Sequence, residues 1–543
     1  MNFKEFESAT KLRGGYYTPE PVADFLMRWV LKNNPKNILE PSCGDGVFIR
    51  ALTNKLKRKI EFIGVELLKE EADKARDFAA KNNKIDAKIH NEDFLEFSLK
   101  ILESGRKYDS IVGNPPYIRY QYLEKKDQEL SELHFRRNNL KFTKHTNAWV
   151  PFIIASIGLL KEGGRLAMVV PSEILHVLHA TSLRHFLIDK CAKILLVDPN
   201  ELLFSEALQG TVLLMVEKKT KNEASKGVSI ISAPDNSFLD KDVDEISKKF
   251  PFVSGEILNG KWMKVLLDPE EIEVFEKVKK LKSIKTFKSI ASVDVGIVTG
   301  ANKFFLVNDE TVKKYGLNKI VKPMFGKSEH CKGIIYDNEV HRKNSEKGLP
   351  TNFVDFSTLK NSKIPKGVCK YIKEGEAQSL NTRYKCRIRT PWYEVPSVYS
   401  TEIGMLKRAH NYPRLILNKA NAYTTDTAYR IKSKVKPDLL VYSFINSLTA
   451  LTAELEGRHY GGGVLELVPS EIEKLLIPIT KINKFKILEL NKKIQSIESA
   501  SEILKEQDEI ILKEAGITKG DRDVIHNAWK RIKARRHRLL GGN

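Results

Sequence analysis

The fold of this chain is decided by Asn37-Ile38-Leu39-Glu40 and by the residues that follow it, Pro41-Ser42-Cys43-Gly44-Asp45-Gly46. The first segment is a short apolar strand that ends in an acid, and the second predicts a tight turn into a helix that starts near Val47. Glycine has no Cβ atom, so the turn lets the backbone approach a ligand closely. A strand, a glycine turn and a helix in this order are typical of a doubly wound α/β domain.

Apolar strands and amphipathic stretches alternate over residues 37–217, which predicts a doubly wound parallel sheet. Three further strands lead to side chains that could bind a ligand: residues 62–65 precede Glu66, residues 87–90 lead to Asp93 and Phe94, and residues 111–113 precede Asn114. Ligands of open α/β sheets bind at the carboxyl ends of the strands, so these side chains are expected to share one site.

The nature of the predicted ligand follows from two features of this segment. Glu66 stands about 20 residues beyond the glycine turn, where an acid typically accepts hydrogen bonds from ribose hydroxyls. Asp93 and Phe94 could hold the amine and the face of an adenine. The turn lacks the third glycine of a dinucleotide-binding helix, so it does not by itself indicate NAD.

The loop after the fourth strand, Asn114-Pro115-Pro116-Tyr117, suits the methylation of an exocyclic amine on a planar base. Such an amine is a poor nucleophile because its lone pair is delocalised into the ring. The Asn114 oxygen and a nearby carbonyl, held still by prolines that have no N–H, could accept its two protons. Tyr117 offers a face on which the base can stack. The alternative is an ordinary Pro-Pro turn with an asparagine cap.

Residues 14–217 resemble the gamma class of adenine-N6 DNA methyltransferases, the TaqI-like modification enzymes of restriction–modification systems. The motif order carries the resemblance: Thr18-Pro19 precedes the glycine turn, and the catalytic loop precedes a long basic remainder. The resemblance implies a class I S-adenosylmethionine-dependent methyltransferase domain that needs no metal and that flips its target base out of double-stranded DNA. It assigns cofactor binding to Thr18, Glu40, Cys43, Gly44, Gly46, Glu66, Asp93, Phe94, Asn114 and Phe152. It assigns catalysis to Asn114, Pro115, Pro116 and Tyr117, and stacking of the flipped base to Tyr117 and Phe204.

Composition indicates the partner and the compartment. The formal net charge of +22 favours a polyanion such as DNA, because neutralising phosphates releases counterions. Five scattered cysteines without a CxxC pair indicate neither disulfides nor a zinc site. The sequence has no apolar run long enough to cross a bilayer and no secretory h-region, so we expect a cytoplasmic protein without membrane contact.

We predict three domains: the methyltransferase domain over residues 1–250, a mixed α+β target-recognition domain over 251–480 and a basic helical extension over 481–543. Segments 295–305 and 460–467 resemble the start and a late part of TaqI-like specificity domains. Lysine and arginine alternate with aromatic residues near Tyr384, and we expect such residues to contact phosphates and base edges. A second basic and aromatic stretch, residues 134–144, is expected either to line the DNA cleft or to be a solvated loop. The basic segment 530–538 is expected to touch the DNA backbone or to fray.

Other functions remain compatible with these motifs. One is a related methyltransferase that acts on RNA or on glutamine in a protein, and another is a non-catalytic DNA-recognition subunit. A fused nuclease is not expected, because the acids and lysines of residues 240–249 are too loosely arranged. By family analogy we expect a monomer that protects DNA from a separate restriction endonuclease.

Overall fold

The computed structural model describes residues 17–55, 58–82, 85–199, 210–258, 260–359, 364–460, 462–480, 486–496 and 499–538. Phe204, the predicted partner of Tyr117 in base stacking, lies outside these residues. The chain forms two compact units, a first unit of Met1–Pro269 with His537–Asn543 and a second unit of Glu270–Arg536. This break comes after the boundary near residue 250 that composition indicated, and the division into three functional domains stays a prediction.

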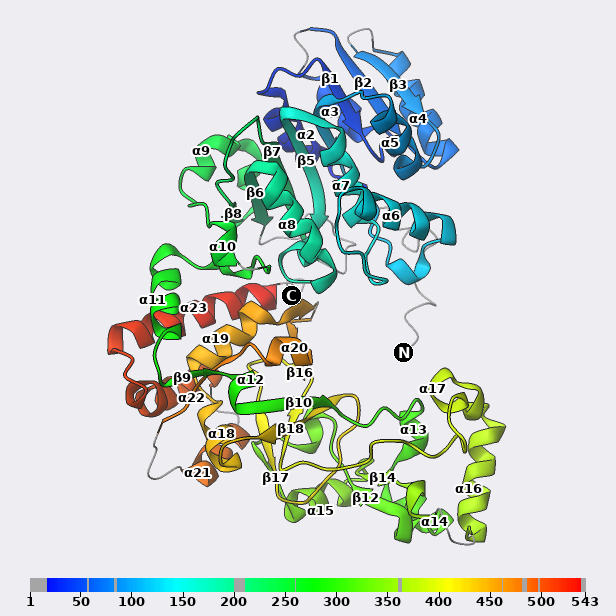
Figure 1. Cartoon of the computed structure of the whole chain (residues 1–543), viewed down its shortest axis with the longest axis vertical. Coiled ribbons are helices and arrows are strands. Elements are labelled where there is room, and N and C mark those ends of the chain that lie inside the picture. Colours follow the sequence, from blue (N-terminus) through cyan, green and yellow to red (C-terminus); the bar gives the residue numbers. More distant parts are fainter. Residues whose placement is uncertain are drawn as a thin grey trace. The chain divides into compact units, whose positions relative to one another are not determined.

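The first unit is built on one eight-stranded sheet with the order β3-β2-β1-β4-β5-β7-β6-β8 (Figure 1). Its strands are β1 (Asn37–Glu40), β2 (Ile60–Val65), β3 (Ile85–His90), β4 (Tyr108–Gly113), β5 (Leu160–Pro171), β6 (Cys191–Pro199), β7 (Thr211–Lys218) and β8 (Val228–Ala233). The order reverses at β1, where β2 lies on one side and β4 on the other. This reversal is the switch point at which open α/β sheets bind their ligands.

The sheet is mixed, whereas the sequence led us to expect a parallel sheet. Strands β1 to β5 pair in parallel, but β7 runs antiparallel between β5 and β6. β6 ends at Pro199 and β7 begins at Thr211. A parallel crossover needs about a dozen residues or more, and the 11 residues between these strands come close to that length, so the length of the connection does not decide the direction of β7. The periodicity of the buried strands is the same in both directions and did not reveal the reversal.

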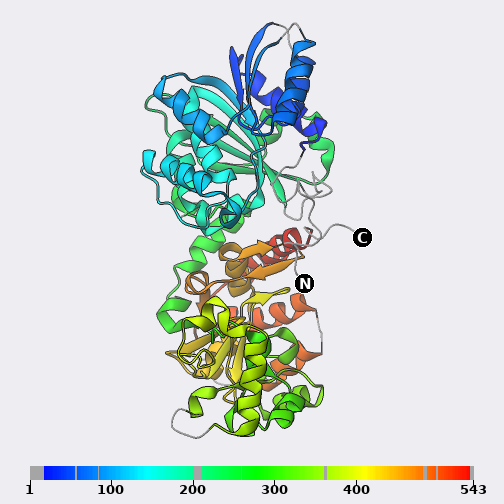
Figure 2. The same ribbon diagram turned by 90° about the vertical axis from the view of Figure 1, so that its right-hand side faces the viewer.

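Helices cover both faces of the sheet (Figure 2). The first face packs in one apolar cluster against α2 (Glu20–Leu31), α3 (Val47–Thr53) and α4 (Lys69–Ala80). The second layer consists of α5 (Phe94–Glu103), α6 (Lys125–Arg137), α7 (Trp149–Leu159) and α8 (Thr181–Lys190). α7 is almost wholly apolar and buried, and it contacts β5 and the other three helices of its layer. A helix that is apolar on all sides is typical of such a central position.

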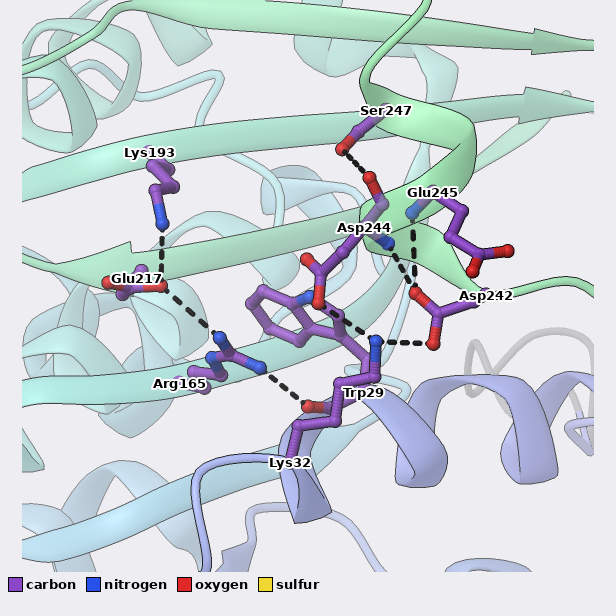
Figure 3. A network of polar contacts seen from close by, with 9 residues as sticks. All are labelled: Trp29, Lys32, Arg165, Lys193, Glu217, Asp242, Asp244, Glu245 and Ser247. Atoms are coloured by element: carbon purple, nitrogen blue, oxygen red, sulfur yellow. Dashed lines mark hydrogen bonds and ion pairs between the residues drawn. The ribbon is translucent and has the colours of Figure 1, made fainter.

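A polar network ties the segment after β8 to the start of the domain (Figure 3). Lys32 at the end of α2 pairs with Asp242 and, at 2.8 Å, with Asp244 of the short helix α9 (Val243–Ser247). Beside this contact, Arg165 of β5 donates to the Trp29 carbonyl at 3.0 Å and faces Glu217 of β7 at 3.5 Å. These contacts make residues up to Ser247 part of the first unit.

The second unit mixes small sheets with helices, as expected for an α+β domain. Its largest sheet has five strands in the order β10-β18-β15-β17-β13. The strands of the unit are β9 (Ile284–Thr286), β10 (Ala291–Val295), β11 (Leu306–Val307), β12 (Val321–Pro323), β13 (Ile335–Tyr336), β14 (Asn352–Val354), β15 (Ile403–Leu406), β16 (Arg408–Ala409), β17 (Leu415–Asn418), β18 (Ala428–Ser433), β19 (Arg458–Tyr460), β20 (Val464–Glu466) and β21 (Leu476–Pro478). Its longer helices are α11 (Pro269–Lys279), α14 (Asp309–Tyr315), α15 (Asn338–Glu346), α16 (Lys366–Ala377), α18 (Pro437–Ser443), α19 (Ser447–Glu456), α21 (Ile487–Gln495), α22 (Ala500–Gln507) and α23 (Lys519–Arg538).

The basic C-terminal segment is a helix anchored in the second unit, not a frayed end. Arg536 of α23 is fully buried and donates to both carboxylate oxygens of Glu454, at 2.7 and 2.9 Å, and to the His410 carbonyl at 2.8 Å. Arg531 pairs with Glu271 of α11. These two arginines therefore pair with carboxylates of the protein itself, a role that a count of basic residues could not reveal. No helix among the described residues is both long and apolar enough to span a bilayer.

Candidate active site

The side chains predicted for the site follow three neighbouring parallel strands. In the register of the sheet Glu40 of β1 lies beside Gly64 of β2, and Leu39 lies beside Ile111 of β4. The carboxyl ends of these strands meet at one edge of the sheet. The glycine turn after β1, Glu66 after β2 and Asn114 after β4 therefore lie at the same edge, at the switch point of the strand order.

The glycine turn takes a backbone conformation that favours glycine. Gly44 and Gly46 have φ values of +50° and +89°, and Gly46 caps the start of α3. A Cβ atom on Gly44 would meet no atom within 4 Å, so this part of the turn faces open space. The left-handed conformation is readily adopted by glycine and costs other residues energy. The turn thus presents a bare stretch of backbone to a ligand.

Cys43 lies on the closed side of the same turn. Its side chain is 2% exposed, and burial raises the pKa of its thiol well above the usual range. A Cβ atom on Gly64 would come within 3.0 Å of the Cys43 sulfur and 2.7 Å of Ile89, so the thiol packs tightly against β2. The Cys43 side chain thus packs under the turn, and the part of Cys43 in cofactor binding stays a prediction.

Glu40 is a buried carboxylate at the centre of the site. It is 1% exposed, and burial, followed by the nearby charges of Glu66 and Asp45, raises the pKa of its carboxyl well above the ordinary value. Among the described residues its Oε2 atom has no hydrogen-bond partner. Burying a charge without a partner is costly. An arrangement of this kind fits a cationic ligand group, such as the amino group of a bound amino acid.

Glu66 ties the glycine turn to the loop after β2. Its two carboxylate oxygens accept hydrogen bonds from the Gly44 and Leu68 backbone N–H groups, each at 2.9 Å. The Asn91 side chain donates to the carbonyls of Glu66 and Leu67, both at 2.9 Å, and fixes the course of this loop. Asn91 was missed from the sequence, although a polar residue directly after β3 was a usable signal.

Asp93 and the two predicted aromatic residues lie near the start of α5. The Asp93 carboxylate caps this helix by accepting from the Glu96 N–H at 2.9 Å, and burial raises the pKa of its carboxyl. Phe94 and Phe152 are largely buried, and their ring centroids are 5.0 Å apart. The structure thus brings together two aromatic residues that are 58 positions apart in the sequence.

The loop that starts at Asn114 is held from two sides. The Asn114 amide donates to the Thr18 hydroxyl at 3.2 Å, and the Ser42 hydroxyl donates to the Asn114 carbonyl at 2.9 Å. Pro115 is buried, and the next two residues of the loop are half-buried. Thr18 and Asn114 are 96 residues apart in the sequence, so this contact joins the Thr-Pro segment to the predicted catalytic loop. Ser42 was missed as a site residue.

The basic and aromatic stretch of residues 134–144 is part helix and part loop, and its place in a DNA cleft stays a prediction. Residues 134–137 are the end of helix α6, in which His134 and Phe135 are fully buried, and residues 138–144 follow as a loop. The Phe135 and Phe142 rings lie 5.2 Å apart and pack edge to face. Phe135 therefore belongs to the core, because the apolar face of an amphipathic helix must be buried. Phe142, in the loop, is half-buried.

The family model "N-6 DNA Methylase" matches residues 3–286 of this chain. A second model, "Type II methyltransferase M.Eco57I, C-terminal domain", matches residues 259–512. The chain is 25% identical over 482 residues to the type II methyltransferase M.AccI of Acinetobacter calcoaceticus, covering 84% of each protein. It is 27% identical over 314 residues to M.HindII of Haemophilus influenzae, covering 54% of this chain and 55% of that protein.

Among solved structures, the type IIL restriction-modification enzyme MmeI in complex with DNA has a similar fold. The TM-score is 0.55 at 13% identity, and the match covers 95% of this chain and 75% of MmeI. At this identity the similarity concerns the fold alone.

Proposed function

The chain belongs to the N-6 DNA methylase family, whose model matches more than half of its length, and on this premise we propose that it methylates N6 of an adenine at a specific site in double-stranded DNA. S-adenosylmethionine, when bound, supplies a methyl group on a positively charged sulfur that an amine can attack. Relatives that bear the name type II methyltransferase support a place in a restriction–modification system. There the enzyme would protect host DNA from a separate endonuclease.

One observation carries the proposal: Asn114 is fixed by Thr18 and Ser42 at the sheet edge that also holds Glu40, the glycine turn and Glu66. Catalytic and cofactor-binding candidates thus share one edge. The Glu40 Oε2 atom, which has no hydrogen-bond partner within the described ranges, suits the amino group of a methionine moiety, and the bare turn at Gly44 suits a ligand that lies against the backbone. The Glu66 carboxylate, already fixed by two backbone N–H groups, has lone pairs left to accept from ribose hydroxyls.

The chain's own contribution to catalysis would be positioning and polar stabilisation. Adenine N6 lies inside the stack of a duplex, so the base must be flipped out, at a cost of a few kcal/mol. Stacking on Tyr117 offsets part of this cost, at about 1–3 kcal/mol per base–aromatic contact. Phe204, which lies outside the described residues, would cover the other face of the base.

Asn114 and the Pro115 carbonyl would then accept the two N6 protons as hydrogen bonds. Drawing these protons out of the ring plane returns the lone pair to the nitrogen, which makes the amine nucleophilic. The contacts of Asn114 with Thr18 and Ser42 hold this geometry before the base arrives, so little reorganisation is needed during the reaction.

A methyl-transfer assay tests the function. Labelled S-adenosylmethionine is incubated with unmethylated double-stranded DNA, and the DNA is digested to nucleosides for chromatography. Label in N6-methyladenine supports the proposal, and mapping of the modified sites gives the recognition sequence. Label in RNA or in protein glutamine but not in DNA would contradict it, and loss of cofactor binding would indicate a recognition subunit without catalysis.

Asn114→Ala tests the catalytic loop. We expect turnover to fall by more than about 100-fold, as for loss of a group that stabilises developing charge, while the affinity for S-adenosylmethionine changes little. Asn33→Ala is a matched control, because this asparagine is exposed and its side-chain amide donates to the Gly163 carbonyl, away from the site. Near-normal turnover of Asn114→Ala would rule out the proposed role of Asn114.

A further inference from the structure

A short helix of the second unit exposes two large apolar side chains beside each other. Tyr384 begins α17 (Tyr384–Arg387) and is 63% exposed, and Ile388 at the end of this helix is 60% exposed. Residues four positions apart lie on the same side of a helix, so the two side chains form one apolar ridge. Val298, in the loop against which α17 packs, is 38% exposed. Exposed apolar side chains that lie side by side in this way make the segment a candidate interaction site.

Helix α17, which carries the ridge, is fixed by contacts with the loop before helix α13 (Asn302–Phe305). Arg389 donates to the carbonyls of Thr299 and Val298, at 2.8 and 2.6 Å, and Cys386 is fully buried. A Cβ atom on Gly300, whose φ is +81°, would come within 2.7 Å of the Lys385 Cβ atom. The loop before α13 is therefore packed directly against α17 (Figure 1). This anchorage fixes the direction in which Tyr384 and Ile388 point.

The surroundings of the ridge are strongly basic. Residues 377–393 contain four basic residues and no acid. Arg383, Lys385 and Arg387 are exposed, and none of these three pairs with a carboxylate within the part of the chain that the structure describes. The Lys385 and Arg387 charges lie 5.5 and 5.6 Å from the centre of the Tyr384 ring. These cations differ from Arg531 and Arg536, which bind carboxylates of the protein itself.

We propose that α17 and its flanks are a DNA-contact surface of the second unit. Arg383, Lys385 and Arg387 contact phosphates, and the ridge of Tyr384 and Ile388 enters the groove between the two rows of phosphates. Unpaired cations complement the charge of a duplex, and apolar side chains contact thymine methyl groups or base edges in the groove. The inference rests on the proposed function, because it takes double-stranded DNA as the substrate.

Two variants separate the two contributions in a binding titration. Fluorescence anisotropy is measured with a duplex that carries the mapped methylation site, over a range of salt concentrations. The triple variant Arg383→Ala, Lys385→Ala, Arg387→Ala should lower the slope of log affinity against log salt by about 2–3, since each phosphate contact contributes about 0.9. The double variant Tyr384→Ala, Ile388→Ala should weaken binding by about tenfold or more, as expected for the loss of a buried apolar contact, with an unchanged salt slope.

Matched controls come from the same unit. Lys319→Ala removes an exposed charge elsewhere, and Leu488→Ala removes an apolar side chain that is 63% exposed on α21. Both should bind DNA as the unchanged protein does. Tyr384→Phe keeps the ring and should retain binding, which separates loss of contact from misfolding.

The outcomes distinguish this inference from the function on which it rests. If the unchanged protein does not methylate DNA, the proposed function fails. If it does, but both α17 variants bind DNA with the original affinity and salt slope, the DNA-contact surface is wrong and the function stands. Altered self-association in light scattering with unchanged DNA binding would likewise overturn the inference and indicate a protein partner.

Discussion

Glu40→Gln should change the stability of the protein and its affinity for the cofactor in opposite directions. The Glu40 carboxyl is 1% exposed, its Oε2 atom lacks a hydrogen-bond partner among the described residues, and its pKa is raised by burial and by Glu66 and Asp45. Glutamine has nearly the same shape but no charge. In the free protein the substitution removes the cost of burying the charge, so we expect the first unit to melt at a higher temperature.

The pH dependence of this effect follows from the direction of the shift. A carboxyl whose pKa is higher in the folded protein than in the unfolded chain stabilises the folded protein at low pH. This contribution is fully present at pH values below the pKa in the unfolded chain, about 4.3 for glutamate. That contribution is lost as the pH rises through the folded pKa. The stability gain of Glu40→Gln should therefore appear only above about pH 4.3 and should grow with pH.

The cofactor affinity should fall. A hydrogen bond to a charged group is worth about 1.5–3 kcal/mol, which corresponds to a loss of about 10- to 140-fold in affinity. A cationic ligand group also favours the ionised carboxylate, so binding to the unchanged protein should strengthen with rising pH and release protons. The Glu40→Gln variant should lack this pH dependence.

Calorimetry measures both effects. Titration with S-adenosylmethionine between pH 5 and 8, in buffers of different ionisation enthalpy, gives the affinity and the number of protons released. Scanning calorimetry without cofactor gives the melting temperature of the first unit. A destabilised variant with unchanged cofactor affinity would refute the reasoning, because Glu40 would then serve the fold and not the ligand.

Two further predictions concern the second unit. Arg536→Ala should lower the free energy of unfolding of the second unit by about 3–5 kcal/mol, because the buried Glu454 carboxylate loses its main partner. Denaturant unfolding measures this free energy. A change below about 1 kcal/mol would contradict a buried ion pair. Burial raises the pKa of Asp508 to about 7. The protonated side chain therefore stabilises the folded protein at pH values below the pKa of aspartate in the unfolded chain, about 3.9. This contribution to stability is lost as the pH rises through about 7. Asp508→Asn keeps an acceptor for the Ser447 N–H and should raise the melting temperature at pH 8 but not at pH 3.5; an equal shift at both values would exclude titration of Asp508 as the cause.

Much of the first unit could be predicted from local sequence. The glycine turn after β1 needs a left-handed backbone conformation at Gly44 and Gly46. Few residues other than glycine adopt this conformation readily, so the turn can be recognised from the sequence. Buried strands are read from their apolar runs, and the residues that end them must meet at one edge if the strands are parallel. The direction of β7 could not be predicted, because an apolar run has no direction.

Contacts between distant segments were decided by the tertiary structure. Composition could not distinguish Arg536, which is buried against Glu454, from Arg387, which is exposed. Helical spacing in residues 125–137 did not show that His134 and Phe135 face the core. Ser42 and Asn91 became site residues only when the chain brought them beside Asn114 and Glu66.

The sequence by itself determined the succession of strands and turns along the chain and the residues that follow the strands at the sheet edge. These depend on backbone preferences and on the alternation of apolar side chains along a few neighbouring residues. The tertiary structure alone decided which charges are neutralised inside the protein and which remain at the surface. Burial and ion pairing depend on side chains that lie far apart in the sequence, as Thr18 and Asn114 do, and they are settled only when the chain has packed.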